Sequence, residues 1–234
     1  MSEWTWEWEG YDPAAERLRE SLCTLGNGYF ATRGAVPECR AGLVHCPGTY
    51  VAGCYNRLES TAAGREVVNE DLVNLPNWLL LRFRLRRAGG PWSPWFSPDT
   101  HALQDYRHTL DLRHATLTRA FRHHDDAVGV LGVEQTSLVH LGDPHLAALR
   151  TAFTAEDWSG EIEVESCLDG EVRALLGTEP LPLTDLAIAC ALSGLGHVVM
   201  RLQARLRPER PPPAVSPATG GSSQVAGGAP RKAS

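Results

Sequence analysis

Apolar and polar side chains alternate along much of the first 170 residues, and this alternation predicts β-strands. At the start, Trp4, Trp6 and Trp8 alternate with glutamates and a threonine. Successive side chains of a strand point to opposite faces, so a period of two is typical of a strand that buries one face. We expect the three indoles to face a core or a groove and the acidic side chains to face water.

The same pattern recurs further along the chain. From residue 78 to 87, leucines and Phe83 fall on one side and Arg82, Arg84 and Arg86 on the other. Further strands are predicted over residues 109–121 (a hairpin), 128–139, 147–153 and 161–167. Only residues 12–19, with a proline at the second position, predict a short helix. Many short strands joined by Gly, Pro and Asp turns predict an all-β fold, a large antiparallel β-sandwich.

The pattern changes after residue 172. The Trp, Tyr and Phe residues (7, 5 and 5) all precede this position, and large apolar side chains are what a core is built from. We therefore expect a sandwich domain at residues 1–172 and a weakly structured segment at 173–207, in which residues 186–206 fit a helix. Residues 208–234 are rich in Pro, Gly and Ser and predict a disordered tail. A shifted reading frame or a prematurely ended gene also accounts for the loss of aromatic residues.

Composition argues against several classes of function. The net charge is −6 at pH 7, and no basic stripe with aromatic residues indicates nucleic-acid binding. The first ten residues have neither a basic leader nor an apolar run, so they do not resemble a secretory signal. The most apolar stretch, residues 181–200, contains Pro, Asp and His and is a poor candidate for a membrane span. The six cysteines show no metal-binding spacing, so we expect reduced, mostly buried thiols and a cytoplasmic protein.

Two charged groups have the composition of active sites but favour simpler interpretations. Glu161, Glu163 and Glu165 share one strand face with neighbours about 7 Å apart, close to the spacing of a glycosidase carboxylate pair. They lie opposite an apolar face, and we interpret them as a solvated polar face. The run His-His-Asp-Asp at 123–126 suggests metal ligands, but neighbouring strand residues point opposite ways, so we interpret it as a hairpin turn. No catalytic residue and no metal ligand is predicted.

A third group combines amides with aromatic rings, in the runs 27–30, 48–56 and 73–78. Aromatic rings stack on the apolar faces of sugars, and amides both donate to and accept from hydroxyl groups. These residues therefore suit a sugar-facing surface. In the alternative interpretation, the asparagines cap turns and the aromatic rings pack beneath them.

Five ordered blocks carry a more specific signal. They are ESLCTLGNGYFATRGA (20–35), GTYVAGCYNRL (48–58), LVNLPNWLLLRF (72–83), LDLRHATLTR (110–119) and DWSGEIEVESCLDG (157–170). Over about residues 4–172 they resemble the N-terminal domain of glycoside hydrolase family 65, which includes maltose, trehalose and kojibiose phosphorylases. The resemblance implies a large β-sandwich that precedes a linker and a helical (α/α)6 barrel, in enzymes that commonly form homodimers.

The resemblance also implies chemistry. In such enzymes a glutamate of the barrel protonates the glycosidic oxygen, and inorganic phosphate, or water in the hydrolases, attacks the anomeric carbon with inversion. Phosphate is thus a co-substrate of the phosphorylases, and no cofactor is implied. No stretch of residues 173–234 resembles the barrel. We therefore expect a domain fragment that is inactive alone on α-linked glucose disaccharides; the alternatives are a standalone carbohydrate-binding module and a dimerisation module.

If a barrel adjoins the sandwich, we expect Tyr50, Asn56, Asn74, Asn77 and Trp78 to lie near its sugar-binding mouth. Each of these residues also has an ordinary role in a turn or a core. The sequence leaves open which disaccharide is the substrate and whether phosphate or water is the acceptor.

Overall fold

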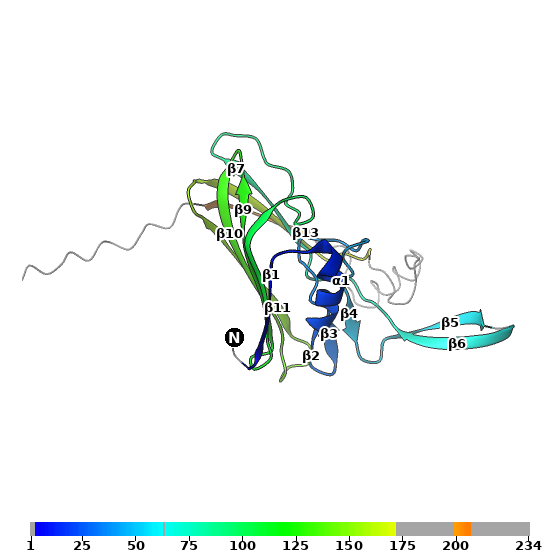
Figure 1. Ribbon diagram of the computed structural model, residues 1–234. Coiled ribbons are helices and arrows are strands. Elements are labelled where there is room, and N and C mark those ends of the chain that lie inside the picture. Colours follow the sequence, from blue (N-terminus) through cyan, green and yellow to red (C-terminus); the bar gives the residue numbers. More distant parts are fainter. Residues whose placement is uncertain (1–2, 63, 172–198, 207–234) are drawn as a thin grey trace, which may run out of the picture.

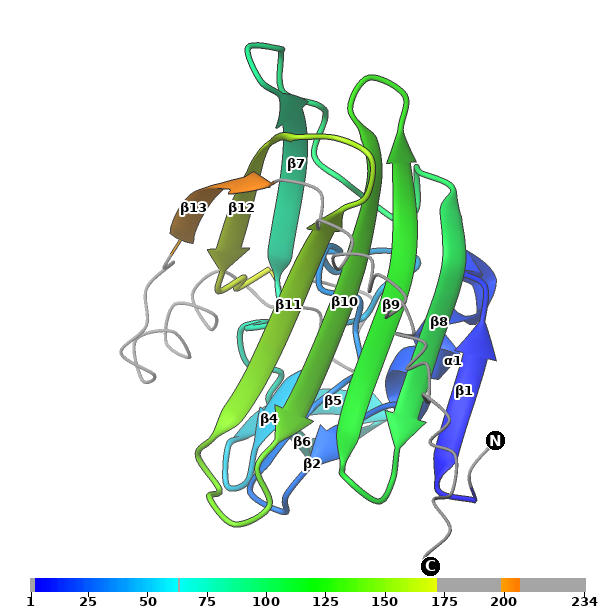
Figure 2. The same cartoon turned by 90° about the vertical axis from the view of Figure 1, so that its left-hand side faces the viewer.

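The computed structural model describes residues 3–62, 64–171 and 199–206, and its body is built on two facing layers of antiparallel strands (Figure 1). One layer is a five-stranded sheet in the order β1-β8-β9-β10-β11, seen face on in Figure 2. Its strands are β1 (Thr5–Glu9), β8 (Leu103–Asp111), β9 (Thr116–Asp125), β10 (Gly129–Val139) and β11 (Ala147–Ala155). Every neighbouring pair is antiparallel.

The facing layer contains a three-stranded sheet in the order β13-β12-β7. Its strands are β7 (Leu81–Arg87), β12 (Gly160–Cys167) and β13 (Val199–Leu206). Phe83, Leu85 and Ile162 are buried on this sheet and pack with Phe121 and Leu131 of the five-stranded sheet in one core, here called the sandwich core. The predicted antiparallel β-sandwich is confirmed.

A helix and a small sheet cover the other end of the same inner face. They are α1 (Pro13–Leu22) and the sheet of β2 (Leu25–Gly26), β3 (Phe30–Thr32) and β4 (Thr49–Val51). In a second cluster, here called the α1 core, Cys23 and Leu25 pack with Leu110, Leu117 and Val139 of the five-stranded sheet. The five-stranded sheet therefore carries two apolar clusters on one face.

Strand β9 contributes to both clusters. Its inward side chains, Leu117, Arg119, Phe121 and His123, are all buried. Leu117 belongs to the α1 core and Phe121 to the sandwich core. Arg119 therefore lies between two apolar clusters, where a charged side chain requires a buried partner.

Helix α1 begins where the sequence predicts. The Asp12 carboxylate accepts a hydrogen bond from the backbone N–H of Ala14 at 3.0 Å, and Pro13 occupies the first turn. The helix continues to Leu22, past the predicted end at residue 19, and its last turn buries Glu20 beside Glu16. In the described part of the chain, no helix has the length and apolar character needed to cross a membrane.

A two-stranded hairpin, β5 (Tyr55–Ala62) and β6 (Arg65–Leu72), extends away from the body of the molecule (Figure 1). The sequence patterns do not predict these strands, because the run RLESTAAGREVVNED is polar and alternates weakly. Tyr55 and Val68 are exposed, and among the side chains that the structure describes, neither core cluster includes one from this hairpin arm.

The prediction of a helix over residues 186–206 is wrong at its C-terminal end. Residues 199–206 form strand β13, in which apolar residues alternate with Arg and Gln. In the observed register these polar positions pair with the glutamates of β12, so the alternation matches the neighbouring strand. The rest of the predicted helix lies outside the described residues, as do residue 172 and the predicted tail at 208–234.

The sequence predicts that Trp4, Trp6 and Trp8 all face a core or a groove. Only one of the three indoles packs against a core. Trp8 packs against the α1 core, whereas Trp4 and Trp6 are each 50% exposed. The α1 core ends at Trp8, and the ring of Trp6 stacks on that of Trp8 with centroids 5.2 Å apart. At the edge strand of the five-stranded sheet, the exposed indole of Trp6 therefore lies on the partly buried indole of Trp8.

Candidate functional site

The polar face of β12 is covered by arginine and tryptophan side chains. Each glutamate pairs with one arginine of β7: Glu161 with Arg86, Glu163 with Arg84 and Glu165 with Arg82. The rings of Trp92 and Trp95, in the loop after β7, lie over these guanidinium groups at 4.4 to 5.1 Å from ring centroid to Cζ.

This arrangement corrects the predicted solvated face, because Glu163 and Glu165 are only 4% and 5% exposed. The arginines stack beneath tryptophan rings and neutralise the carboxylates, so the polar side of the sheet is closed by ion pairs and cation–π contacts. A general acid must hold a proton that it can donate. These ion-paired glutamates therefore do not form a catalytic carboxylate pair.

The predicted hairpin turn begins at the end of the run 123–126: residues 123–125 are the last of β9, and residues 126–128 form the turn to β10. Asp125 ends β9, and its carboxylate accepts hydrogen bonds from the backbone N–H groups of Ala127 and Val128 at 2.9 and 3.0 Å. His123 points inward and lies near the ring of Phe96, 4.9 Å between centroids. A hollow of about 410 Å³ opens beside this turn and is lined by both histidines, both aspartates and Trp92.

Two of the five predicted sugar-facing residues act as turn caps. The Asn74 side chain accepts from the backbone N–H of Thr49 at 2.9 Å and donates to the carbonyl of Pro47 at 3.1 Å. Asn77 accepts from the backbone N–H of Leu79 at 3.1 Å. Both asparagines are 2% exposed, so their observed contacts match the turn-capping interpretation.

The other three predicted residues lie on different elements. Tyr50 is buried on β4, Asn56 lies on β5 of the hairpin arm, and Trp78 packs edge-on against Phe30 with centroids 6.3 Å apart. The buried Tyr50 hydroxyl and Trp78 Nε1 have no hydrogen-bond partner among the described residues. The five residues thus lie on β4, on the hairpin arm and in the segment between β6 and β7.

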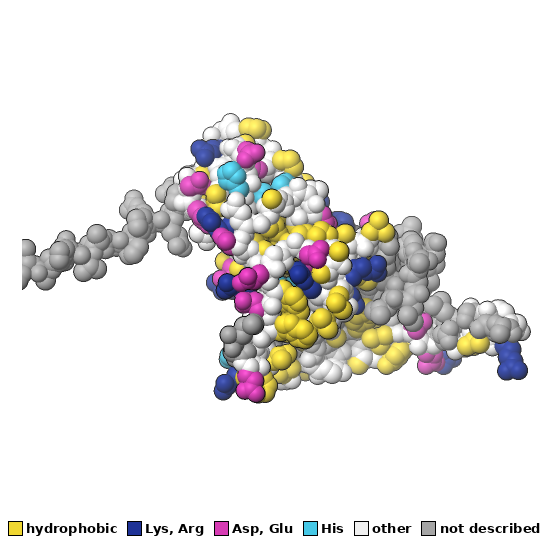
Figure 3. Space-filling model, viewed as in Figure 1, with side chains coloured by type: hydrophobic (Ala, Val, Ile, Leu, Met, Phe, Trp, Pro, Cys, Tyr) yellow, Lys and Arg dark blue, Asp and Glu magenta, His cyan; other side chains and the backbone are white. Residues whose placement is uncertain are grey.

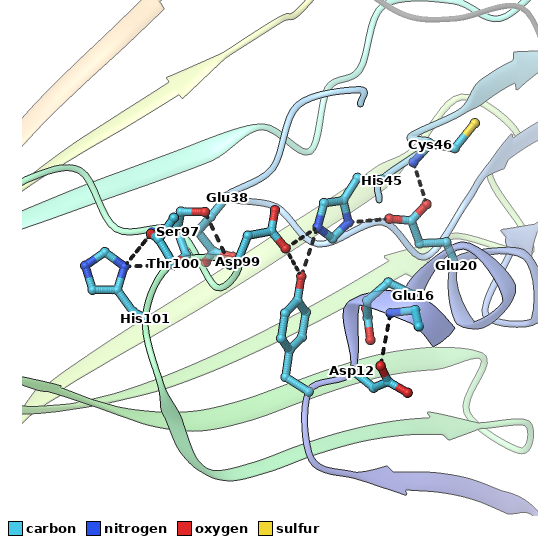
Figure 4. A network of polar contacts seen from close by, with 12 residues as sticks. Asp12, Glu16, Glu20, Glu38, His45, Cys46, Ser97, Asp99, Thr100 and His101 are labelled. Atoms are coloured by element: carbon cyan, nitrogen blue, oxygen red, sulfur yellow. Dashed lines mark hydrogen bonds and ion pairs between the residues drawn. The ribbon is translucent and has the colours of Figure 1, made fainter. Parts of the chain in front are cut away.

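Sequence reasoning missed a polar cluster between α1 and the loop after β7 (Figure 4). The ring of His45 lies at its centre, with Nδ1 2.8 Å from Glu20 Oε1 and Nε2 3.0 Å from the Tyr11 hydroxyl. The Tyr11 hydroxyl donates to Asp99 Oδ1 at 2.5 Å. The second oxygen of Glu20 accepts from the backbone N–H of Cys46 at 2.8 Å. Glu20 and His45 are far apart in sequence, so only the fold brings them together.

The protonation of this cluster follows from its charges. Burial alone lowers the pKa of His45, but its hydrogen bond to Glu20 and the charge of Asp99 outweigh burial and raise it above its ordinary value. Burial and the hydrogen bond to Asp99 raise the pKa of the Tyr11 hydroxyl. Burial raises the pKa of Glu16, whose carboxylate also contacts Arg19 at 3.0 Å.

A second buried network supplies the partner that Arg119 requires. Its guanidinium pairs with Glu38, and its Nε donates to Gln135 Oε1 at 3.1 Å. Gln135 Nε2 closes the triangle by donating to Glu38 Oε1 at 2.8 Å. All three side chains are buried between the two core clusters. Their location between the two clusters and their contacts with one another indicate a role in joining the layers of the fold.

Two buried histidines predict loss of stability in mild acid. Burial and the nearby Arg119 lower the pKa of His108 to about 3, and burial and His101 lower that of His123 to about 4. The unfolded chain protonates near pH 6.5, so below that pH the unfolded state binds more protons. The stability contributed by the neutral imidazoles is complete above pH 6.5. It falls by about 2 kcal/mol per histidine between pH 7 and pH 5.

The measurement is urea unfolding followed by tryptophan fluorescence at pH values from 7 to 5. In His108→Gln the free energy of unfolding should depend less steeply on pH, whatever its value at pH 7. The exposed His145→Gln is the matched control and should keep the parent slope. Parallel slopes for His108→Gln and the parent would contradict this assignment.

The observed features define a class of protein domain: an antiparallel β-sandwich in which the three glutamates of β12 are ion-paired. The family follows from comparison with known sequences. Residues 6–205 match the model of glycosyl hydrolase family 65, N-terminal domain, and the chain belongs to this family. The match extends beyond residue 172 through most of β13.

Individual relatives agree with the family. An uncharacterized glycosyl hydrolase of Mycobacterium tuberculosis (strain H37Rv) is 48% identical over 173 residues, which are 74% of this chain and 13% of that protein. A kojibiose phosphorylase of Caldanaerobacter subterraneus is 29% identical over 164 residues, 70% of this chain and 19% of that enzyme. The chain thus spans less than a fifth of either relative.

The fold also matches a solved structure. It is described as a candidate kojibiose phosphorylase from the human microbiome, with a TM-score of 0.62 and 22% identity over 73% of this chain and 22% of that chain. This likeness supports the sandwich architecture.

Proposed function

We propose that this chain is the N-terminal sandwich of an enzyme that cleaves α-glucosidic disaccharides with inversion, and that the reacting groups belong to a separate barrel domain. The observation that carries the proposal is the match over residues 6–205 together with β12 glutamates that are all ion-paired. Maltose, trehalose and kojibiose are the proposed substrates, phosphate or water is the acceptor, and the cytoplasm is the proposed location.

An apolar surface supports contact with another domain. Hydrophobic side chains gather over β1 and α1 in Figure 3, where Trp6, Leu18 and Leu22 are 50%, 64% and 42% exposed. Exposed apolar patches of this kind mark interaction surfaces. We assign this surface to the barrel, because the relatives are five or more times longer than the matched segment.

The predicted sugar-facing residues fit the same proposal. Buried polar groups in folded proteins nearly always have hydrogen-bond partners, yet Tyr50, Trp78 and Asn77 each carry a buried polar atom without one in the described structure. Because these atoms have almost no accessible surface in the described fold, a neighbouring domain or its bound sugar would supply the partners only if the side chains turn outward on contact. Tyr50, Asn56, Asn74, Asn77 and Trp78 are therefore proposed to lie beside the sugar-binding mouth of the barrel.

The test is a phosphorolysis assay on the purified chain with maltose, trehalose or kojibiose and inorganic phosphate. We expect no β-glucose 1-phosphate and no glucose above the blank, because the general acid is not in this domain. Turnover that disappears in Glu163→Gln, with the fold retained by circular dichroism, would overturn the assignment of catalysis to a separate barrel.

A standalone carbohydrate-binding module is the second candidate. The stacked rings of Trp6 and Trp8, at 5.2 Å and 18° between planes, resemble a platform on which a sugar ring packs. This candidate predicts saturable binding of maltose or trehalose by calorimetry, lost in Trp6→Ala and kept in the control Trp95→Phe. Self-association in sedimentation without any effect of sugar would instead support a dimerisation module.

A further inference from the structure

Ligands of the kind that bind transition metals meet beside the His45 ring, whose contact with Asp99 is drawn in Figure 4. One ligand atom each from Cys39, His45 and Asp99 lies within 4.8 Å of the other two. The Tyr11 hydroxyl adjoins them, 3.0 Å from His45 Nε2 and 2.5 Å from Asp99 Oδ1. One thiol, one imidazole, one carboxylate and one phenol therefore face a common point.

The histidine is oriented as in a metal site. Glu20 holds Nδ1 of His45 at 2.8 Å and is itself fixed by the backbone N–H of Cys46. This leaves Nε2 directed toward Tyr11 and Asp99. Metal-binding histidines commonly use the second ring nitrogen in this way, with a carboxylate that sets the tautomer and strengthens the ligand.

The distances are close to those that tetrahedral zinc requires. Bonds of about 2.0–2.3 Å to N, O and S place neighbouring ligands roughly 3.3–3.8 Å apart. His45 Nε2 and Asp99 Oδ1 are 3.4 Å apart, which already fits. The three ligand atoms lie up to 4.8 Å apart. Rotation about the side-chain bonds must therefore move the Cys39 thiol about 1 Å closer to the other two ligand atoms.

Burial and charge also suit a cation. Cys39 and His45 are 6% and 3% exposed, whereas the Asp99 side chain is 35% exposed and opens a route from solvent. Burial raises the pKa of the Cys39 thiol, with smaller contributions from Glu38 and Asp99, while Arg119 lowers it. A divalent ion bound to Asp99 would favour the thiolate of Cys39.

We propose that Cys39 Sγ, His45 Nε2 and Asp99 Oδ1 form a zinc site, with a water in the fourth position that is held by the Tyr11 hydroxyl once this hydroxyl gives up its 2.5 Å contact with Asp99 Oδ1. Binding releases the thiol proton of Cys39 to solvent, together with any proton on Nε2. A mixed sulfur, nitrogen and oxygen set favours zinc over magnesium or calcium. The ion joins the start of α1, the segment before β4 and the loop after β7, so its expected role is structural.

The experiment titrates the metal-free full chain with Zn²⁺ in competition with a chromophoric chelator, and repeats the titration with Co²⁺. We expect one equivalent to bind, a thiolate-to-cobalt charge-transfer band, and a higher melting temperature with Zn²⁺. Cys39→Ser should abolish the band and the thermal shift. Cys54→Ser, a free cysteine outside the cluster, is the matched control and should keep both.

Two further variants separate metal binding from folding. Asp99→Asn alters a partly exposed ligand without emptying a core position, and it should weaken zinc binding while the chain stays folded by circular dichroism. Glu20→Gln should weaken binding roughly 10–100-fold by loosening His45. No saturable zinc binding by the parent, or equal affinity in Cys39→Ser and the parent, would overturn the proposal.

Discussion

Replacing Glu38 by alanine is expected to destabilise the protein by about 3–5 kcal/mol, because it leaves the buried Arg119 guanidinium without its counter-charge. Arg119 lies between the two apolar clusters, and its remaining partner is the neutral Gln135. Burial lowers the pKa of Arg119, and Glu38 outweighs this and raises it. The charge is therefore retained, and its desolvation is uncompensated in the variant.

Chemical denaturation of Glu38→Ala against the parent measures this effect. The double variant Glu38→Ala/Arg119→Met is the control, since it removes both charges and leaves an apolar stem in place. We expect it to be more stable than Glu38→Ala alone by at least about 1 kcal/mol, as for other buried pairs replaced by apolar groups. If the double variant is less stable than the single one, the assigned charge pairing is wrong.

Phe83→Ala is expected to cost about 3–5 kcal/mol, through lost burial and an unfilled cavity. Phe83 is 0% exposed at the centre of the sandwich core. Its ring stacks on Phe96 at 4.6 Å and meets Phe153 edge-on at 5.1 Å between centroids. The Phe83 side chain thus packs β7 against the loop after it and against β11. The alanine variant loses both of these contacts.

The measurement is the midpoint of thermal or urea unfolding. Phe83→Leu is the graded control and should lose less than half as much, because it retains most of the buried apolar volume. The exposed Leu141→Ala, at 68% exposure, should change stability by less than about 0.5 kcal/mol. A Phe83→Ala variant as stable as Leu141→Ala would show that the two sheets do not pack as described.

Alternation in the sequence predicted the strands that bury one face. The leucines and arginines from residue 78 to 87 fall on opposite sides of β7, and the hairpin at 109–121 corresponds to β8 and β9. The hairpin arm was missed because its strands bury neither face in a core cluster, so selection for apolar alternation is weak there. Strand β13 was missed because its apolar residues also fit a helical face.

The buried polar networks could not be predicted from spacing. Glu38 and Arg119 are 81 residues apart, and Glu20 and His45 are 25 apart. Nothing local marks them as partners. The glutamates of β12 show the same limit, since their exposure depends on arginines contributed by β7 and on indoles in the next loop. From the sequence alone, a polar strand face is interpreted as solvent-exposed even where side chains of other elements pack over it.

We propose that this sandwich serves a catalytic domain outside it. The most direct measurement replaces the matching 164-residue segment of the Caldanaerobacter kojibiose phosphorylase with the corresponding residues of this chain and follows glucose 1-phosphate release from kojibiose. We predict turnover well above that of the same enzyme with the segment deleted. A folded chimera no more active than the deletion variant would contradict the claim.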